Sequence, residues 1–310
     1  MAERDRVHVT VDGQSLELSN LDKVLYPAAR FSKGEILDYY TRVSGVLLPH
    51  LADRALTRIR YPNGVGGAFF FEKNAPAGTP EWVRLEKLPA PGSGSGRDML
   101  DYVVCDDLPT LVWLANLAAL ELHTPQWRVE ALDPPADSVA LARPDLLVVD
   151  LDPGAPAGLA ECCEVALLMR DRLARDGLEA YPKTSGKKGM QLACPVAATQ
   201  TAETISGYAK RVAEELEKAH PRRITSKMTK KLRPGKVFID WSQNNAAKTT
   251  VAPYSLRAMA TPTVSTPLGW DEVEAGVEAG WFTATEVLAR VEEYGDLFAP
   301  PDAVGPEVPT

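Results

Sequence analysis

The stretch Asp145-Leu-Leu-Val-Val-Asp-Leu-Asp152 is the most informative part of the sequence. It is a continuous apolar run that ends in two carboxylates, which is typical of a strand buried in a sheet. In a strand, residues i and i+2 point to the same face, so Asp150 and Asp152 should lie side by side. Two such carboxylates are costly unless a cation meets them, and divalent cations prefer oxygen ligands. The run therefore predicts a metal site, although two surface acids before a turn would have the same sequence.

A third carboxylate, Asp240, lies in the apolar segment VFIDWS, which is also predicted to be a strand. If the two strands are neighbours, the three carboxylates could hold two metal ions about 4 Å apart. One ion would lower the pKa of a 3′-hydroxyl, and the other would hold a triphosphate and neutralise the leaving pyrophosphate. The alternative is that Asp240 only anchors Trp241 or the basic loop before it.

Two basic segments lie near these acids in the sequence. Residues 222–236, RRITSKMTKKLRPGK, carry seven Lys or Arg and no acid, although the net charge of the chain is −8. A local basic patch, rather than net charge, determines phosphate binding. Residues 183–189, KTSGKKG, can cradle phosphate with backbone N–H groups, and Lys188 adds a charge. The spacing is not that of a Walker A motif, and a solvated loop or polar hairpin remains the alternative for each segment.

The elements around these motifs mix strands and helices without a steady βαβα alternation. This order predicts an α+β fold with a mixed or antiparallel sheet. Residues 1–55 are expected to form an accessory hairpin and helix packed on a core of residues 56–298, and the Pro-rich residues 299–310 a disordered tail. Helices are predicted by apolar spacing and by capping residues such as Ser32 and Asp107 at the following ranges: 32–51, 107–123, 158–177, 201–220, and two short ones near residues 270 and 283.

Composition sets further bounds. A hydrophobic fraction of 45% and a charged fraction of 25% are ordinary for a soluble globular protein. No run of about 18 apolar residues is present, and the charged N-terminus lacks a signal core, so no membrane partner and a cytoplasmic location are expected, nucleoid-associated if the family resemblance described below holds. The four cysteines form no C-x-x-C pair, which favours buried reduced thiols over a zinc site.

Taken together, the motifs resemble one family, the polymerase domain of bacterial ATP-dependent DNA ligase D. This family is a branch of the archaeo-eukaryotic primase superfamily. The resemblance extends from about Leu16 to about Pro300 and implies a primase-like core with a mixed or antiparallel sheet flanked by helices. The chain is then a stand-alone relative or an excised domain. The motifs that carry the resemblance are, in order, LDKVLYP, TRIRYPNG, FFFEKNAP, LELHTP, VVDLDP, KTSGKKG, VFIDWSQN and APYSLRA.

The resemblance implies a role for each matching position. Asp150, Asp152 and Asp240 match the catalytic, metal-binding carboxylates. The positions that match residues holding the incoming nucleotide, mainly its triphosphate and sugar, are His123, Ser185, Lys188, Gln243 and Arg257. The positions that match DNA-binding residues are Lys23 and Lys33 (a pocket for a downstream 5′-phosphate), Phe70 and Phe71 (stacking near the templating base) and Arg233 (a template contact on a mobile loop). Taken alone, His123 and Arg257 could equally be structural residues, and the two phenylalanines could be core residues.

The resemblance also implies an activity. The chain would add nucleotides, preferentially ribonucleotides, to DNA 3′ ends during gap filling or non-homologous end joining, using two Mn²⁺ or Mg²⁺ ions. Its partners would be DNA with gaps or 3′ overhangs and a downstream 5′-phosphate, NTP or dNTP substrates, the Ku end-binding protein and an ATP-dependent DNA ligase. Residues 88–97 are Gly/Ser-rich where the family has a loop that aligns two DNA ends, so end bridging stays open.

Three other functions compete with this interpretation. A primer-independent primase would start strands without a primer, but Lys23 and Lys33 favour gap filling. A metal-dependent phosphoesterase or nuclease could use the same acids, but Lys188 and Arg257 favour a bound triphosphate. A catalytically silent DNA-binding module is disfavoured by the three intact carboxylates.

Overall fold

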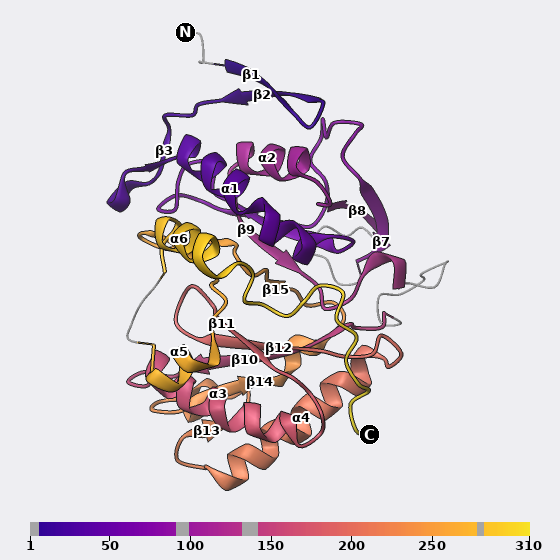
Figure 1. The fold of residues 1–310 in the computed structure, drawn as a ribbon, viewed down its shortest axis with the longest axis vertical. Coiled ribbons are helices and arrows are strands. Elements are labelled where there is room, and N and C mark those ends of the chain that lie inside the picture. Colours follow the sequence, from indigo (N-terminus) through magenta and orange to yellow (C-terminus); the bar gives the residue numbers. More distant parts are fainter. Residues whose placement is uncertain (1–5, 91–98, 132–141, 278–281) are drawn as a thin grey trace.

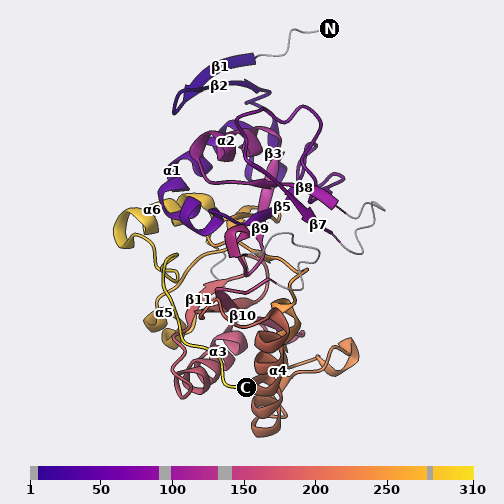
Figure 2. The same ribbon diagram turned by 90° about the vertical axis from the view of Figure 1, so that its right-hand side faces the viewer.

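The computed structural model describes residues 6–90, 99–131, 142–277 and 282–310. Figures 1 and 2 show two β-sheets, one above the other along the longest axis, with helices around them. The mostly antiparallel sheets and separate helices make this an α+β fold, as predicted. The Gly/Ser-rich stretch 88–97 falls almost wholly on residues 91–98, which lie outside the described residues.

The five-stranded sheet is built around β10 (Leu146–Pro153), the strand that contains the two sequence-predicted acids. Leu147, Val149 and Leu151 belong to the hydrophobic core that this sheet shares with its helices. Asp150 and Asp152 alternate with them and therefore lie on the opposite face. All pairings in this sheet are antiparallel except β13 with β14. Its other strands are β11 (Tyr181–Thr184), β12 (Met190–Pro195), β13 (Ile224–Thr225) and β14 (Val237–Asp240).

Two amphipathic helices cover the core face of this sheet, as Figure 1 shows. Helix α3 (Leu159–Ala174) is followed by Gly177, whose φ of +76° ends the helical path. Helix α4 (Ala202–Ala219) begins where the Thr201 side chain accepts a hydrogen bond from the backbone N–H of Thr204. Both helices were predicted from the spacing of their apolar residues.

The six-stranded sheet has β5 (Ala55–Arg60) near its centre. Its core includes the apolar faces of α1 (Lys33–Leu51) and α2 (Leu108–Asn116). The predicted capping box at the start of α1 is present, because the Ser32 and Glu35 side chains each bond the other's backbone N–H. The other strands of the sheet are β6 (Phe70–Glu72), β7 (Leu85–Pro89), β8 (Met99–Val104), β9 (Ala119–Thr124) and β15 (Thr250–Val251).

The prediction of one helix from Asp107 to His123 was wrong. Helix α2 ends at Asn116, and the chain turns at Ala118, which has a φ of +59°. The following residues form β9, which pairs with β5. Apolar runs of this kind occur in buried helices and in buried strands alike, so composition did not separate the two. The consequence is that His123 lies on a strand, where it shares a face with Glu121.

The N-terminal hairpin has the predicted form. Strands β1 (Arg6–Val11) and β2 (Gln14–Ser19) pair across a two-residue turn in which Asp12 and Gly13 both have positive φ. Leu16 and Leu18 pack into the same core as α1. A short pair, β3 (Val24–Tyr26) and β4 (Phe31–Ser32), leads into that helix. The division of the chain at residue 55 stays a prediction.

The C-terminal part of the chain contacts both sheets. Strands β16 (Leu256–Ala258) and β17 (Pro262–Val264) pair with each other, α5 (Trp270–Ala275) packs on α3, and α6 (Ala284–Tyr294) packs on α1. Among the described residues, no helix is both long enough and apolar enough to cross a membrane.

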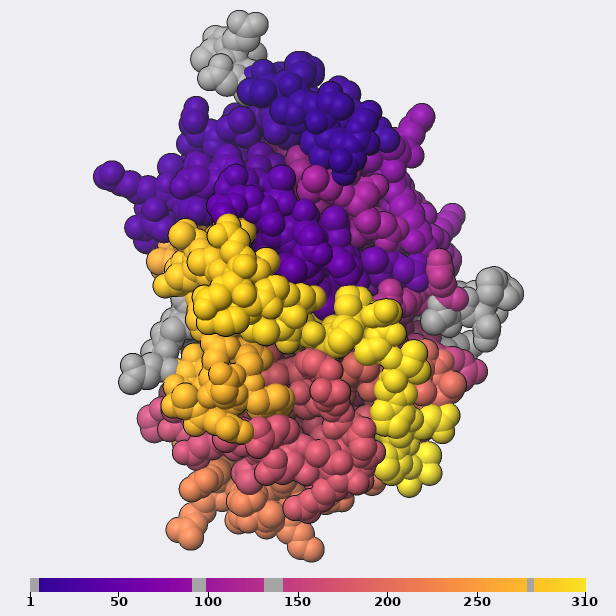
Figure 3. All heavy atoms as spheres, viewed as in Figure 1, coloured from indigo at the N-terminus to yellow at the C-terminus, as the bar shows by residue number. Residues whose placement is uncertain are grey.

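Residues 299–310 lie along the surface, where Figure 3 shows them in yellow. Their composition predicted a disordered tail, but Val308 is only 2% exposed and packs into the core of the five-stranded sheet. The backbone N–H of Ala197 donates to Pro306 O (3.1 Å), and Val308 is bound through both its N–H and its carbonyl by the side chain of Gln200. Two buried apolar residues, Ala299 and Val308, and a few hydrogen bonds to the backbone therefore hold a segment that composition alone does not place.

Candidate active site

The three sequence-predicted carboxylates lie on neighbouring strands. Antiparallel pairing places Asp240 at the end of β14 directly opposite Asp150 on β10. Asp152 lies two residues further along β10, on the same face as Asp150. The prediction that two distant strands bring Asp240 beside the D-x-D pair is therefore confirmed.

The carboxylates destabilise one another's charged forms. Burial raises the pKa of Asp150 to about 7, and the charges of Asp152 and Asp240 add to this effect. Burial and the charge of Asp240 also raise the pKa of Asp152, while Arg233 opposes the shift. A cation bound beside these partly buried acids would stabilise their ionised forms.

The carboxylate oxygens are the ligands that a hard divalent cation prefers, although Asp150 and Asp240 already accept hydrogen bonds from the protein. Asp150 Oδ1 accepts a hydrogen bond from Gln191 Nε2 (3.1 Å), and Asp240 Oδ1 accepts one from the backbone N–H of Ser242 (3.0 Å). Within the described part of the chain, no three His, Cys, Asp or Glu side chains are already arranged to hold an ion. The oxygen chemistry and the adjacency of the acids suit a metal, and the side chains would reorient to coordinate it.

A buried lysine, which sequence reasoning missed, controls the orientation of Asp150 through Gln191. Lys183 Nζ donates to Gln191 Oε1, to Val251 O (3.0 Å) and to Ser265 Oγ (2.7 Å). Gln191 presents its oxygen Oε1 to Lys183 and its amide nitrogen Nε2 to Asp150. On the sheet Gln191 pairs with Asp150 on one side and Lys183 on the other, a register that the sequence does not reveal.

A cavity of about 400 Å³ lies in front of the acids, between the two sheets. Asp150, Asp152 and all five residues predicted to bind nucleotide line this cavity. The residues that line it are His123, Asp150, Asp152, Ser185, Lys187, Lys188, Gly189, Gln191, Gln243, Thr249, Thr250, Val251, Arg257 and Met259. They come from β9 and β15 of one sheet, from β10 and β12 of the other, from the β11–β12 loop and the turn after β14, and from β16 with the residue that follows it.

The loop between β11 and β12 has a shape that depends on a serine and a glycine. Ser185 Oγ accepts hydrogen bonds from the backbone N–H groups of Lys187 (3.2 Å) and Gly189 (3.1 Å), which closes the loop. Gly186 has a φ of +67°, and a Cβ there would lie 2.6 Å from Arg257 Cγ. The glycine therefore lets Arg257 pass beneath the loop, where its Nη1 donates to Ser185 O (2.7 Å).

A fully buried acid, Glu121, connects the basic residues of this cavity, and sequence reasoning missed it too. Its carboxylate lies 3.1 Å from His123 Nε2, 3.1 Å from Lys187 Nζ and 3.3 Å from Arg257 Nη2. Burial alone would raise the pKa of Glu121, but these partners outweigh it and hold that pKa well below its usual range. The alternation of Glu121 and His123 within LELHT is the signal that a strand assignment would have provided.

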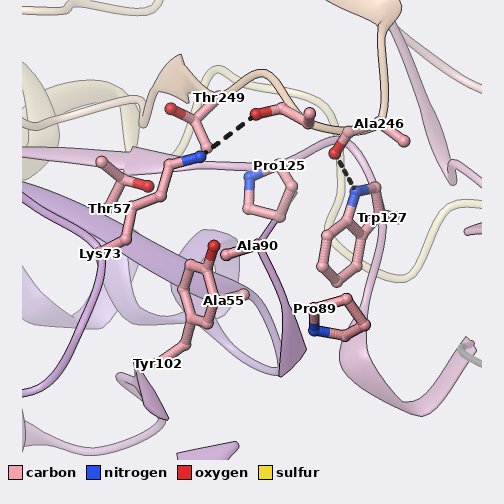
Figure 4. Close-up of a pocket in the computed structure, with 11 residues that line it drawn as sticks. Ala55, Thr57, Lys73, Pro89, Ala90, Tyr102, Pro125, Trp127, Ala246 and Thr249 are labelled. Atoms are coloured by element: carbon pink, nitrogen blue, oxygen red, sulfur yellow. Dashed lines mark hydrogen bonds between the residues drawn. The ribbon is translucent and has the colours of Figure 1, made fainter. Parts of the chain in front are cut away.

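Residues of segment 246–249 line a smaller pocket beside the cavity, together with residues of β5 and β8 (Figure 4). Trp127 Nε1 donates to Ala246 O (2.9 Å), and Lys73 Nζ lies 3.5 Å from Ala247 O. Thr249 lines both the pocket and the cavity. These contacts fix the segment that links Gln243 to β15.

The residues predicted to bind DNA lie outside the cavity lining. Phe70 and Phe71 on β6 are 50% and 57% exposed, so the alternative of core residues is excluded. Phe69, which sequence reasoning did not single out, is 57% exposed, and its ring lies 5.7 Å from that of Tyr61 at an interplanar angle of 31°. Exposed aromatic rings of this kind offer faces on which bases can stack.

The basic segment 222–236 projects beside α4, as the orange loop of Figure 2 shows. It is joined to the turn after Asp152, because the N–H of Gly154 donates to Lys236 O (2.8 Å) and the N–H of Gly235 donates to Gly154 O (2.8 Å). Arg233 lies over the ring of Phe238, 3.7 Å from its centroid. The predicted template-contacting residue is thus held next to the carboxylates.

Lys23, which immediately precedes β3, lies beside Lys33, the first residue of α1. The N–H of Lys33 donates to Lys23 O (2.9 Å), and Lys23 Nζ donates to Pro62 O (2.6 Å). Burial, and secondly the charge of Lys23, lower the pKa of Lys33 to about 8. Two close ammonium groups whose charges repel are suited to an anionic ligand.

The cysteines take no part in the site. All four are buried free thiols, as predicted, and burial raises the pKa of each. Thiols of this kind pack as small apolar groups and are unreactive.

An α+β fold with three facing carboxylates and a basic cavity between two sheets describes a class of nucleotide-handling enzymes. Residues 32–298 match the family model of the LigD primase-polymerase domain, and the chain belongs to that family. Its members are nucleotidyltransferases of DNA repair.

Curated relatives and a solved structure agree with this assignment. The chain is 45% identical over 94% of its length to the multifunctional non-homologous end joining protein LigD of Mycolicibacterium smegmatis, and 33% identical over 91% to the bifunctional LigD of Bacillus subtilis. It spans 37% and 43% of the length of these proteins. The polymerase domain of Mycobacterium tuberculosis ligase D, solved in complex with DNA, is 42% identical, with a TM-score of 0.83 over 91% of this chain and 96% of that one.

Proposed function

We propose that the chain adds nucleotides to the 3′ end of DNA, with a preference for ribonucleotides, in gap filling or non-homologous end joining. The observation that carries this proposal is that Asp150, which Asp240 faces across the sheet, and Asp152 line a cavity that is also lined by all five expected nucleotide-binding residues. The similarity to a polymerase domain solved with DNA supports the choice of DNA as partner.

Each group of residues has a defined part in this reaction. Asp150, Asp152 and Asp240 would hold two Mg²⁺ or Mn²⁺ ions, which supply activation of the 3′-hydroxyl and neutralisation of the leaving pyrophosphate. The triphosphate would lie against Ser185, Lys188 and Arg257. The sugar would lie near His123 and Gln243, which come from opposite sides of the cavity.

The DNA would lie across the exposed aromatic and basic groups. Phe70 and Phe71 would stack near the templating base, Arg233 would contact the template, and Lys23 with Lys33 would bind a downstream 5′-phosphate. Ku and an ATP-dependent DNA ligase are the proposed protein partners, because the named relatives are end-joining proteins.

Primer extension on a gapped duplex with a 5′-phosphate tests this function. The assay contains Mn²⁺ and either ribonucleotides or deoxyribonucleotides, and it compares the protein with the Asp150→Ala/Asp152→Ala variant. We expect extension by the unmodified protein alone, and faster with ribonucleotides. Product without a primer would favour a primase, and shortened substrate without extension would favour a phosphoesterase or nuclease.

A further inference from the structure

Glu121 is an acid in a cavity whose expected ligand is strongly anionic. Its side chain is fully buried, and it lies beneath the lining residues His123, Lys187 and Arg257. A negative charge there weakens the attraction for a triphosphate, so its presence calls for another physical reason. The reason lies in what the carboxylate does to the three groups around it.

The carboxylate fixes which nitrogen of His123 carries the proton. Glu121 Oε2 lies 3.1 Å from His123 Nε2, and an ionised carboxylate can only accept. The proton is therefore on Nε2. Burial lowers the pKa of His123, and the charges of Arg257 and Lys187 lower it further against the opposing effect of Glu121, so the ring is neutral at neutral pH. A neutral ring with a proton on Nε2 has a lone pair on Nδ1.

The lone pair on Nδ1 determines which ligand groups His123 can hydrogen-bond. His123 lines the cavity, and among the described residues Nδ1 has no hydrogen-bond partner. Phosphate oxygens are acceptors and would be repelled by a lone pair, whereas a sugar hydroxyl is a donor. Of the two nucleotide classes, only a ribonucleotide has a 2′-hydroxyl in addition to the 3′-hydroxyl.

We propose that Glu121 is a positioning residue that locks His123 in the tautomer accepting a hydrogen bond from the ribose 2′-hydroxyl. This inference rests on the proposed function and names the origin of its sugar preference. A site built to bond a hydroxyl discriminates against the analogue that lacks it, because its polar group is then left unpaired. The same carboxylate also pairs with Arg257 Nη2 (3.3 Å) and Lys187 Nζ (3.1 Å), which keeps it ionised and therefore an acceptor toward His123.

The Glu121→Gln variant is expected to reverse the tautomer of His123 while keeping the shape of the side chain at position 121. Glu121 Oε1 faces two obligate donors, the backbone N–H of Ala258 (3.0 Å) and Lys187 Nζ (3.1 Å), whereas Oε2 faces only one, Arg257 Nη2 (3.3 Å), so the glutamine carbonyl oxygen takes the Oε1 side. The glutamine amide then faces His123 Nε2 and donates to it, which moves the histidine proton to Nδ1. Glu292→Gln, an exposed acid on α6 paired with Arg42, is the matched control.

The first measurement is nitrogen-15 NMR of the histidine rings in the DNA-free protein at neutral pH. The chain has four histidines, and the His123→Asn spectrum identifies the signal of interest. We expect a protonated Nε2 and an unprotonated Nδ1 in the unmodified protein and in Glu292→Gln, and the reverse in Glu121→Gln. A proton on Nδ1, or on both nitrogens, in the unmodified protein overturns the proposal whether or not the protein is a polymerase.

The second measurement is the binding of ATP and dATP to the DNA-free protein with Mg²⁺, followed by KM and kcat for each in primer extension. Glu121→Gln should lower the preference for ATP by roughly threefold to tenfold, the worth of one hydrogen bond. In a His123→Ala background, the same change should leave the preference unaltered. Equal weakening of ATP and dATP by Glu121→Gln would mean a merely structural role and refute the tautomer lock. Failure of the unmodified protein to bind or extend either nucleotide would instead refute the proposed function, because the NMR result does not depend on it.

Discussion

The two carboxylate oxygens of Asp240 have different partners. Its Oδ1 accepts hydrogen bonds from the backbone and hydroxyl of Ser242, which begins the short turn after β14. Its Oδ2 faces Gln243 Nε2 (3.4 Å) and lies 3.9 Å from Lys248 Nζ. The structural alternative raised by the sequence and the proposed metal role are therefore compatible, and a variant has to separate them.

We expect Asp240→Asn to abolish nucleotide addition while the fold and DNA binding persist. Asparagine Oδ1 can still accept from Ser242, but a neutral amide is a poor ligand for a hard cation. Extension should fall at least a hundredfold, roughly the loss of a few kcal/mol of transition-state stabilisation. Extension assays and thermal unfolding would be measured on the same preparation. A large drop in Tm together with lost DNA binding would show that the structural role dominates.

We expect Lys33 to make the proposed preference for a downstream 5′-phosphate dependent on pH. Its pKa is lowered to about 8, so in the free protein the ammonium group loses its proton as pH rises through that value. A terminal phosphate is doubly charged above about pH 6 and favours the protonated lysine. The advantage of phosphorylated over unphosphorylated gapped DNA should thus be complete below pH 7 and shrink above pH 8, by at most about tenfold per pH unit.

Binding titrations at several pH values, with both DNA forms, would check this expectation. In the Lys33→Ala variant the ratio of the two affinities should no longer change across the same range. A ratio that stays constant with pH in the unmodified protein would remove Lys33 from the phosphate pocket.

At the scale of elements, the β11–β12 loop depends on close contact rather than on backbone freedom alone. Gly186 and Gly177 both have positive φ, but a Cβ would meet Arg257 and Val264 only at Gly186. Gly186→Ala should therefore raise KM for the nucleotide severalfold, because Arg257 is displaced. Gly177→Ala, after α3, should introduce the same backbone strain of about 1 kcal/mol without displacing a neighbouring side chain, so KM should not change. Similar KM values for the two variants would argue against the role of the loop in holding the nucleotide.

Much at this scale could be predicted from local sequence. Capping residues, apolar spacing and the Asp12-Gly13 turn placed the hairpin and most helices correctly. The error at residues 117–123 arose because a buried strand directly follows a buried helix, with no polar residue or glycine to mark the boundary.

Only part of the candidate site could be predicted from the sequence, for a related reason. Asp150, Asp152 and the basic loops are recognisable as local patterns, whereas Gln191 and Lys183 act only through the register of an antiparallel ladder. Glu121 depends on a strand that was mistaken for a helix, and its partners Lys187 and Arg257 are distant in sequence. Long-range pairing of this kind is a property of the folded chain, and local patterns do not encode it.

At the scale of the whole molecule, the C-terminal segment links the two halves. Phe298 packs edge-on against His50 of α1, Arg128 Nη2 donates to Pro301 O, and Val308 lies in the core of the five-stranded sheet. Because the cavity is formed between the two sheets, this segment contributes to keeping the site assembled.

Two valines of this segment provide a matched test of its docking. Val308 is 2% exposed and Val304 is 85% exposed. We expect Val308→Ala to lower the free energy of unfolding by about 2 kcal/mol, through lost apolar burial, and Val304→Ala to change it by less than about 0.5 kcal/mol. Urea denaturation of both variants would measure this difference. Indistinguishable midpoints would mean that the segment is not docked in solution.

The run of exposed phenylalanines on β6 has a consequence for how the protein behaves when DNA is absent. Strand β6 is short, its pairing with β5 is antiparallel, and it carries two of three neighbouring aromatic side chains that are about half exposed. An apolar strand of this kind is a surface on which other chains can adhere, and proteins tolerate such strands when they are brief. The free protein should therefore self-associate at high concentration. Stacked bases would then act as a solubilising cover, so that the nucleic acid is a stabiliser of the dispersed state as well as a substrate.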